Sequence, residues 1–577
     1  MCGIVGTSWS KKAREFIIGG LEKLEYRGYD SAGIYYLDKD NKSNLIRTIE
    51  RVKKLKDITP HFDEGIAIGH TRWATHGGVS INNAHPQSSY DQKVFVVHNG
   101  IISNYKEIKA SLIDSGIKFV SDTDTECISN LFSFCLYKKK MSEYDALKYL
   151  YDNLKGQMSA LIYDNKKLFF IKKGSPLLIG KSDDEVFLAS DSLPLIGYAN
   201  KVCYLEDKTY GIINKNKINV FKDNKKIKLK FVKLDDSNGN ISLGNYDYYM
   251  LKEIDEEPDR LLDLSNKIEK EVSSELLECL RNEKIMILGS GTSYHAGLYA
   301  KKWFKVTNMI ASEFVYDDKE YDNYTFVLLS QSGETFDLIK AIEKIRSGQN
   351  NKIISLINKE NTTIERLSDF YLNLHAQPEI AVASTKVYLN EVVALYILYQ
   401  ILNNKEYKDS IKELVENLKK VSANKDYIYE YAKKISKVKN AYFVGRGFDY
   451  KLALEASLKL KEVSYIHSEA TYAGELKHGP IALIDKNFLT IFMITDKKFN
   501  DIIDSNISEI NARFGKIMIL STTGIESKYD GFIVDYHSDL SGLVLIMFAQ
   551  YLSYYVALNR KLNIDKPKNL AKSVTVE

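Results

Sequence analysis

The stretch TFVLLSQSGETFD (residues 325–337) carries the pattern that decides the fold of more than half of this chain. It begins as an apolar, β-prone run, passes through a turn rich in Ser, Gln and Gly, and then opens a helix-like pattern. A strand, a turn of small residues and a helix in this order are typical of a βαβ unit in a parallel, doubly wound sheet. We therefore expect an α/β region around this stretch.

The same order of strand, turn and helix is repeated along the second half of the chain. Strands of this kind are predicted at 284–291, 325–335 and 352–358, and again at 441–447, 488–495 and 516–522. The two groups resemble each other in the order of their elements rather than in close identity. We interpret them as two doubly wound units, 239–424 and 425–567, followed by a short tail, 568–577.

Residues 1–238 show a different pattern, with many short alternating strands separated by Gly, Asn and Asp. Helices are predicted only at about 11–24 and 124–137, so the region is typical of an α+β domain with packed antiparallel sheets. The polar segment LDDSNGNISLGNY (234–246) follows and is predicted to be a linker. A length of 577 residues favours about three or four domains in all.

Composition excludes several classes of protein. A formal charge of +4 on 577 residues argues against a dedicated nucleic-acid binder. Five cysteines, at 2, 127, 135, 203 and 279, show neither a disulfide framework nor metal-ligand spacing, which favours a reducing cytoplasm and no metal. We also expect no membrane contact, because no uninterrupted apolar run reaches about 18 residues and no signal peptide is evident.

The chain opens with MCGIVG, which places a thiol at position two. A frayed N-terminus is the simplest interpretation. The alternative is that Met1 is removed, leaving Cys2 as a nucleophile whose own α-amine serves as its base. The later HNG (98–100) is predicted to end a strand in a sharp turn. That turn would offer the Asn99 side chain and the Gly100 N–H to an oxyanion, although a plain turn is the commoner meaning.

Two further segments carry groups that could recognise an amino acid. GHTRWATHG (69–77) contains Arg72, whose planar guanidinium suits a carboxylate. SDTDTE (121–126) starts a predicted helix, so Asp122 or Thr123 could simply be a cap, whereas Asp124 could meet a substrate ammonium group. A cation for the carboxylate and an anion for the amine are what amino-acid binding requires.

Six motifs in this region resemble the glutaminase domain of N-terminal-nucleophile amidotransferases: MCGIVG, LEYRGYDSAG (24–33), HTRWATHG, NAHP (83–86), HNGII and SDTDTE. The resemblance implies an αββα sandwich with Cys2 as nucleophile and Asn99 and Gly100 as the oxyanion hole. It also implies that glutamine is held by Arg72, Trp73, Thr75, His76 and Asp124. Trp73 would in addition gate an internal route for ammonia.

Phosphate-binding features dominate the second half. SQSGET (330–335) and GSGTSYHAG (289–297) place hydroxyls and N–H groups at predicted helix starts, after the carboxyl ends of parallel strands. Each could be a capped turn, but two such turns favour a bound phosphate, and GSGTSY lacks the third glycine of a dinucleotide fingerprint. In 453–480, Lys459 and Glu462 share one helix face, and we expect them to form a partly buried cluster with Glu475 and His478. Lys572, in the tail, could form a Schiff base.

SQSGET, VASTK (382–386), LKLKE (458–462), AGELKHGP (473–480) and NLAKSVTVE (569–577) resemble the isomerase half of the glutamine–fructose-6-phosphate aminotransferase family. The resemblance implies two tandem sugar-isomerase (SIS) subdomains and amide transfer from glutamine to fructose 6-phosphate, the first committed step of hexosamine synthesis. His478 would open the sugar ring, Lys572 would form an imine at C2, Glu462 would move a proton between C1 and C2, and Lys459 would be a further catalytic lysine. The sugar phosphate would be held by Thr292, Ser293, Ser330, Gln331, Ser332, Thr335 and Ser384.

The resemblance further implies a homodimer through the isomerase units, with no cofactor and no nucleic-acid partner. Two alternatives remain open. Another glutamine amidotransferase would carry a different phosphate motif and no catalytic lysine in its tail. A sugar-phosphate sensor built on the isomerase units would not need Glu462 or Lys572.

Overall fold

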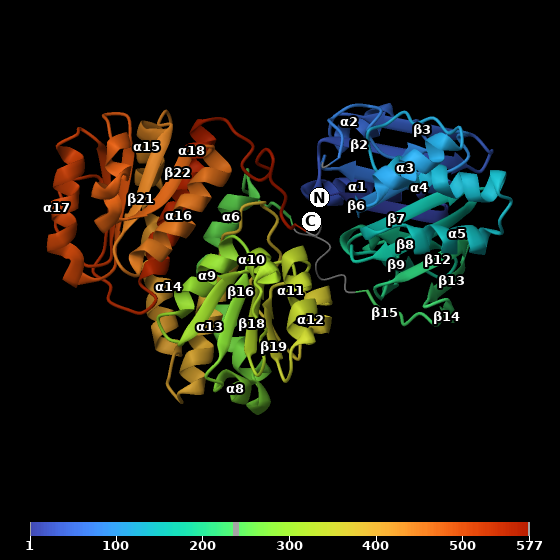
Figure 1. The fold of residues 1–577 in the computed structure, drawn as a ribbon. Coiled ribbons are helices and arrows are strands. Elements are labelled where there is room, and N and C mark those ends of the chain that lie inside the picture. The colour runs from blue at the N-terminus through green and yellow to red at the C-terminus, as the bar shows by residue number, and fades with distance from the viewer. Residues whose placement is uncertain (1, 75, 235–241, 575–577) are drawn as a thin grey trace. The chain divides into compact units, whose positions relative to one another are not determined.

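The computed structural model describes residues 2–74, 76–234 and 242–574 of the chain (Figure 1). It divides into two compact units, one comprising residues up to 241 together with Ser573 and Val574, and the other comprising Ser242–Lys572. Most of the predicted linker, residues 235–241, lies outside the described part of the chain.

Two antiparallel sheets form the first unit. In the first sheet the strands follow the order β15 (Val232–Lys233), β11 (Lys201–Tyr204), β9 (Leu178–Lys181), β10 (Val186–Ala189), β1 (Gly3–Ser10), β4 (Gly65–Arg72), β2 (Ser31–Asp38) and β3 (Ser43–Thr48). In the second sheet the order is β14 (Lys225–Ile227), β13 (Lys217–Lys222), β12 (Thr209–Asn214), β8 (Lys167–Lys173), β7 (Gly156–Asp164), β6 (Phe95–Ile102) and β5 (Gln87–Ser88).

Three buried clusters show how these sheets are layered. The middle cluster joins the facing sides of the sheets and includes Ile4, Ile68 and Leu161. One outer cluster packs α1 (Ala13–Leu24) and α2 (Val52–Ile58) on the first sheet, and the other packs α3 (Tyr105–Asp114), α4 (Thr125–Ser133) and α5 (Glu143–Asn153) on the second. Strands apolar on both faces need this double cover, so the result is an αββα sandwich.

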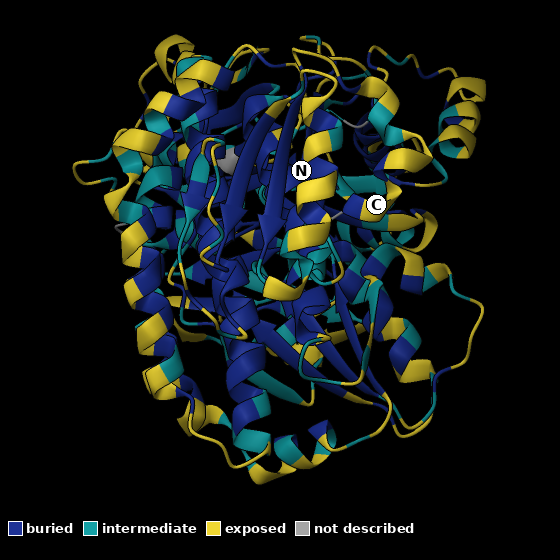
Figure 2. Ribbon diagram, turned by 90° about the vertical axis from the view of Figure 1, so that its left-hand side faces the viewer, coloured by how far each residue is buried: buried dark blue, intermediate teal, exposed yellow. Residues whose placement is uncertain are grey.

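The second unit contains two five-stranded parallel sheets with the same strand order. The first runs β17 (Val306–Ile310), β16 (Ile285–Gly289), β18 (Thr325–Ser330), β19 (Lys352–Ile357) and β20 (Phe370–Asn373). The second runs β22 (His467–Tyr472), β21 (Asn440–Gly445), β23 (Leu489–Ile494), β24 (Lys516–Ser521) and β25 (Gly531–Ile533). The central strands are buried while the outer faces of the surrounding helices are exposed (Figure 2).

Helices surround both parallel sheets. Those before and around the first sheet are α6 (Tyr249–Asp255), α7 (Glu257–Lys267), α8 (Ser274–Leu280), α9 (Thr292–Ala300), α10 (Ala311–Tyr316), α11 (Phe336–Ser347), α12 (Thr363–Leu367) and α13 (Lys386–Leu402). Those of the second are α14 (Lys408–Ala423), α15 (Lys425–Ile435), α16 (Asp449–Ser464), α17 (Asn500–Asn511) and α18 (Gly542–Asn559).

The turn after the first strand in chain order, β16 or β21, is the same in both halves of this unit. Gly291 and Gly447 have φ angles of 55° and 56°. A Cβ on Gly289 or Gly445 would lie within 3.0 Å of the backbone four residues later, so each turn brings its helix close against its strand. The shared strand order and turn geometry support the predicted duplication.

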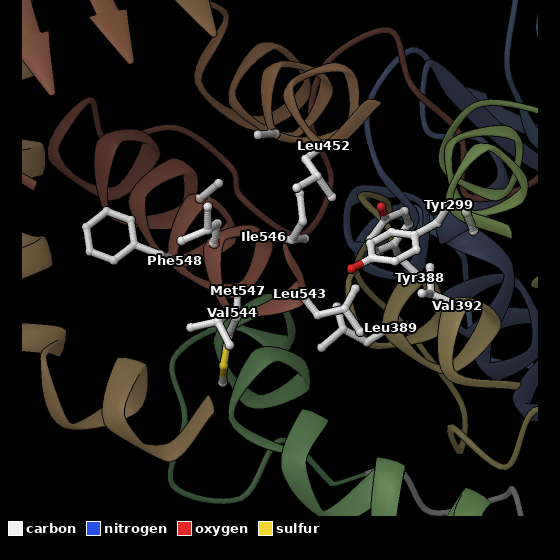
Figure 3. Close-up of a cluster of buried hydrophobic side chains, with 14 of the residues drawn as sticks. Tyr299, Tyr388, Leu389, Val392, Leu452, Leu543, Val544, Ile546, Met547 and Phe548 are labelled. Carbon is white, nitrogen blue, oxygen red and sulfur yellow. The ribbon is translucent and has the colours of Figure 1, made fainter. Parts of the chain in front are cut away.

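Helix α18 corrects one expectation from the sequence. Its 18 residues include no charged side chain, so it is the one described helix long and apolar enough to cross a membrane. However, 83% of it is buried inside the protein. Leu543, Ile546 and Met547 belong to one core cluster with Leu389 and Leu452 from α13 and α16 (Figure 3). A helix that is apolar all round is here the interior helix of a large core.

Candidate active sites

Cys2 precedes β1 and is half-buried beside the end of β4, because the β1–β4 pairing places Gly3 opposite Thr71. The backbone N–H of Trp73 donates a hydrogen bond to Cys2 Sγ at 3.3 Å. From the other sheet, Asn99 Nδ2 donates to the carbonyl of Cys2 at 2.9 Å. The structure thus brings the expected nucleophile together with Asn99 and Trp73.

Burial and the neighbouring groups act on the pKa of the Cys2 thiol in opposite directions. Burial raises the pKa of the thiol, while the Trp73 N–H and the positive charge of Arg72 act in the opposite direction. A thiol in this environment needs a base to become the reactive thiolate.

The prediction for HNG was wrong in one respect, because β6 does not end there. It continues to Ile102, and Asn99 and Gly100 pair with Ser159 and Met158 of β7. Gly100 has φ of 125°, and a Cβ at this position would lie 2.0 Å from the Gln157 carbonyl oxygen. Only glycine fits this conformation, and the buried Asn99 Oδ1 has no described partner.

Arg72 is buried at the end of β4, and its guanidinium donates to the carbonyls of Gly77 (2.9 Å) and Gly78 (3.2 Å). It therefore shapes the loop that follows it. His76, in that loop, has its ring 5.5 Å from the Tyr105 ring, whereas Thr75 lies outside the described residues. The arginine and the loop that were predicted to hold glutamine are thus adjacent.

Asp124 is the residue that caps α4, but its side chain makes no capping bond. Its carboxylate instead accepts a hydrogen bond from the Ile102 N–H at 2.8 Å. The simpler interpretation, a cap by Asp122 or Thr123, is therefore wrong. Asp124 ties the start of α4 to the end of β6, the strand that carries Asn99 and Gly100.

Sequence reasoning missed a cluster of three buried histidines behind this site. His85 and His98 each bond to the Thr125 hydroxyl, at 2.7 and 2.9 Å, and His70 bonds to the His98 carbonyl at 2.9 Å. Burial lowers the pKa of all three, that of His70 to about 3, so they are neutral. The cluster could have been predicted from the sequence, because His70, His85 and His98 each lie within or next to a motif of the glutaminase resemblance.

In the second unit, the SQSGET turn follows β18 and the GSGTS turn follows the neighbouring β16. After β16 the chain continues to β17 on one side, and after β18 it continues to β19 on the other side. Ligands of doubly wound folds bind at such a switch point, beside the carboxyl ends of the two strands. Ser330 Oγ accepts from the Gly333 N–H at 3.0 Å and lies 3.1 Å from Thr335 Oγ1. Ser332 Oγ accepts from the Glu334 N–H at 3.2 Å.

The other predicted phosphate ligands lie at the same edge. Gln331 is half-buried in the turn, Thr335 caps α11, and Thr292 and Ser293 begin α9. The turn is closely packed, because a Cβ on Gly333 would meet the Thr362 hydroxyl at 2.2 Å.

Lys459 is fully buried within an ionic cluster on α16, whose member Glu462 is partly exposed. Its ammonium is 2.7 Å from Glu462, 3.4 Å from Glu455 and 3.0 Å from the Thr292 hydroxyl. Burial alone would lower the pKa of Lys459, but the two carboxylates reverse this and raise it. Glu455, which the sequence analysis did not single out, also bonds to His295 at 2.8 Å.

Lys572 reaches a second buried carboxylate, Glu379. Its ammonium bonds to Glu379 Oε2, which also accepts from the Ser384 hydroxyl at 2.8 Å. A further buried carboxylate, Glu391, accepts from Ser293 at 2.7 Å. Lys572, Ser384 and Ser293 were predicted from the sequence, whereas Glu379 and Glu391 were missed because no pattern distinguishes them.

Two members of the expected 453–480 cluster are elsewhere. Glu475 and His478 lie in a 3₁₀ turn, Ala473–His478, and both are exposed. In the described part of the chain no hydrogen bond or ion pair joins His478 to Lys459, Glu462 or Lys572. The prediction that all four form one partly buried cluster is therefore wrong for this pair.

The turn after β21 differs from its counterpart in chemistry. Asp449 occupies the position of Ser293, and its buried carboxylate accepts from the N–H of Thr495 at 3.0 Å. An internal carboxylate thus bridges the two strand ends at the place where a phosphate would be bound. This geometry favours the first parallel sheet of the second unit, with its turns after β16 and β18, as the phosphate site.

Comparison with known proteins identifies both units. The family described as SIS domain matches residues 280–401 and 434–560, and the family described as Glutamine amidotransferase domain matches 70–196. The curated glutamine–fructose-6-phosphate aminotransferases (isomerizing) of Fusobacterium nucleatum and Francisella tularensis are each 38% identical, and each alignment covers 100% of both chains.

A solved structure agrees with this match. The C-terminal domain of glucosamine-fructose-6-phosphate aminotransferase from Francisella tularensis covers 56% of this chain and 99% of its own, with 32% identity and a TM-score of 0.53. The expected fold class, a glutaminase domain with antiparallel sheets followed by two parallel SIS units, is confirmed. Because relatives of 38% identity match it from end to end, the chain belongs to the family of glutamine–fructose-6-phosphate aminotransferases (isomerizing).

Proposed function

We propose that this chain transfers the amide nitrogen of glutamine to fructose 6-phosphate, with ketose–aldose isomerisation, and releases glutamate and glucosamine 6-phosphate. The observation that carries the proposal is the buried contact between Lys572 and Glu379, beside Ser384 and within the unit that holds the hydroxyl-lined turns. A buried lysine amine next to a sugar-phosphate site is suited to imine formation with a ketose.

In the first unit, Cys2 is the nucleophile and its α-amine, after loss of Met1, is the base. The thiolate attacks the side-chain amide of glutamine, and the Asn99 amide and the Gly100 N–H stabilise the oxyanion. Protonation of the amide nitrogen releases ammonia, and water hydrolyses the remaining thioester to glutamate. Glutamine is held by Arg72, Trp73, Thr75, His76 and Asp124.

In the second unit, Lys572 forms the imine at C2, and ammonia then displaces the lysine amine to leave the imine of the sugar with ammonia. Glu462 moves a proton from C1 to C2 of that imine. Lys459, 2.7 Å from Glu462, directs that carboxylate. The phosphate is bound by Ser330, Gln331, Ser332 and Thr335 with Thr292 and Ser293, and Ser384 contacts the sugar.

His478 is proposed to open the sugar ring, although it is exposed and not bonded to the residues above. This position supports a homodimer in which His478 of one copy serves the site of the other. An exposed catalytic histidine in each protomer is what a shared site requires.

Ammonia would be protonated in bulk water, so we propose an internal route between the two sites, gated by Trp73.

We propose the domain limits 1–238, 239–424, 425–567 and 568–577. We also propose a reducing cytoplasm as the compartment, because reducing conditions keep Cys2 a free thiol.

The test is to supply glutamine and fructose 6-phosphate and to measure glutamate and glucosamine 6-phosphate together. Equal amounts of both products are expected. Glutamate without amino sugar would favour an amidotransferase with another acceptor, and sugar-phosphate binding without either product would favour a sensor. Lys572→Arg is the control, since it should lose the amino sugar and retain the glutaminase.

A further inference from the structure

Glu379 lies just before α13 with its side chain fully buried, and each carboxylate oxygen has its own partners. Oε2 accepts from Lys572 Nζ and from the Ser384 hydroxyl at 2.8 Å. Oε1 accepts from the backbone N–H of Thr385 at 2.8 Å and of Val387 at 3.3 Å. The backbone fixes one oxygen, so the other is held at a constant place beside the lysine amine.

A second buried glutamate braces this arrangement. Glu253, on α6, accepts from the N–H groups of Ile380 and Ala381, the two residues that follow Glu379. Burial, and then the charge of Glu379, raise the pKa of Glu253 to about 8. Burial also opposes ionisation of Glu379, but the charge and hydrogen bond of Lys572 outweigh it and lower its pKa. At neutral pH, therefore, Glu379 carries the negative charge and Glu253 is protonated.

An ammonium group cannot attack a carbonyl, so Lys572 must first lose a proton to a nearby base. Among the described residues, Glu379 is the one carboxylate paired with Lys572, whereas Glu462 is paired with Lys459. Lys572 and Glu379 have side-chain exposures of 4% and 0%, which leaves little access for water as an alternative acceptor.

We propose that Glu379 is the proton carrier for imine formation at Lys572. The inference rests on the proposed function, and it assigns a catalytic group that neither the motifs nor the predicted site included. Glu379 takes one proton from the Lys572 ammonium, and the free amine attacks C2 of the open-chain ketose to form a carbinolamine. Glu379 then returns the proton to the carbinolamine hydroxyl, which leaves as water as the C=N bond forms.

The steps balance. An ammonium and a carbonyl become a protonated imine and one water molecule, and Glu379 ends as the carboxylate with which it began. Four other titratable side chains interact electrostatically with Glu379, namely Glu253, Glu257, Glu391 and Lys459. None of them replaces Glu379 in the contact with Lys572 Nζ.

The test is the pH profile of borohydride trapping at Lys572 with fructose 6-phosphate, in the full chain and in Glu379→Gln. The variant keeps the shape of the side chain but cannot carry a proton. We expect its plateau rate to fall about 100-fold or more. We also expect its midpoint to move to lower pH by about one unit or more, because no anion then favours the charged amine.

Glu256→Gln is the matched control. Glu256, which is partly exposed, pairs with another buried lysine, Lys386, at 2.8 Å, so the substitution breaks the ion pair of a buried lysine without touching Lys572. Its trapping profile should match the unmodified chain. Binding of glucitol 6-phosphate, which has no carbonyl, checks that Glu379→Gln retains a folded sugar site, and Glu379→Asp should restore part of the rate.

If the unmodified chain traps Lys572 and Glu379→Gln shows the same midpoint, the proton-carrier role is overturned while the proposed function stands. A loss of plateau rate without a shift in midpoint would mark Glu379 as a structural residue only and would also overturn the role. If the unmodified chain is not labelled at Lys572, the imine assignment in the proposed function fails.

Discussion

Lys459 Nζ lies 2.7 Å from Glu462 Oε2, one turn further along α16, with side-chain exposures of 0% and 20%. The ammonium is also 3.4 Å from Glu455, whose side chain is fully buried. One lysine therefore forms ion pairs with two carboxylates, and it fixes the direction of the carboxylate that is proposed to move protons.

Lys459→Met should destabilise the second unit, because the substitution leaves Glu455 and Glu462 without their cation. Removing one partner from a buried ion pair costs about 3–5 kcal/mol of unfolding free energy. Lys433→Met is the control, since Lys433 and its partner Glu430 are 4.0 Å apart and mostly exposed, a pair worth about 0–1 kcal/mol. Calorimetry should show a lower melting temperature for the first variant alone, and equal melting of both would contradict the role assigned to the cluster.

Cys2→Ser should lower glutamine hydrolysis by at least about 1,000-fold, as loss of a nucleophile does. Borohydride labelling of Lys572 should be unchanged, because Cys2 and Lys572 belong to separate units. Cys279→Ala, which removes a half-buried thiol of the second unit, is the matched control and should retain full hydrolysis. Substantial glutaminase activity in Cys2→Ser would exclude the thiol as nucleophile.

Gly100→Ala should abolish glutamine hydrolysis and lower stability, because its Cβ would lie 2.0 Å from the Gln157 carbonyl oxygen. Gly116→Ala separates this clash from backbone strain. Gly116 also has positive φ, 80°, but open space where a Cβ would lie, so its cost is only about 1–2 kcal/mol. Hydrolysis rates and melting curves measure both effects. Equal behaviour of the two variants would show that the close approach of β6 and β7 does not matter.

The long buried strands could be predicted from the sequence because they are continuous apolar runs. The stretch 325–335 became β18 (Thr325–Ser330) followed by its turn, and 516–522 became β24 (Lys516–Ser521). The sheet edges could not be predicted. β22 reads HSEATY and is partly exposed, and β20 has only four residues. Edge strands lack the apolar pattern because one side faces no neighbouring strand.

Some of the site residues could likewise be predicted from the sequence, and others could not. Cys2, Lys459 and Lys572 lie in motifs, whereas Glu379 and Glu455 are single carboxylates in apolar surroundings. Such a glutamate becomes informative only when the fold shows what faces it, here Lys572 in one case and Lys459 with His295 in the other. His478 illustrates the opposite error, since proximity in the sequence to Lys459 did not bring it into the same cluster.

Thr335→Val should weaken the binding of fructose 6-phosphate, because it removes a hydroxyl of the SQSGET turn and preserves the volume of the side chain. A lost hydrogen bond to a charged group is worth about 1.5–3 kcal/mol, so KM should rise about 10- to 150-fold. Lys498→Ala, at the corresponding turn after β23, is the control and should leave KM unchanged, since Asp449 already bridges that turn. A larger effect of the Lys498 variant would instead indicate that the phosphate binds at the second parallel sheet, beside the turn after β23.

Asp449→Asn should change how stability depends on pH. Burial raises the pKa of Asp449 to about 6, although hydrogen bonds from Thr495 oppose this, and the ordinary value is 3.8. Between about pH 4 and 6 the folded chain therefore keeps a proton that the unfolded chain has lost, so this group lowers stability as pH rises through that window. Relative to Asp449→Asn, which does not titrate, the unmodified chain should lose about 2 kcal/mol of unfolding free energy between pH 4 and 6, and the difference should level off above about pH 7. Asp426, also in the first turn of its helix but exposed, gives the control variant Asp426→Asn, which should follow the unmodified chain. Urea unfolding from pH 4 to pH 8 measures the difference, and a constant value across the window would mean that the bridging carboxylate is ionised throughout.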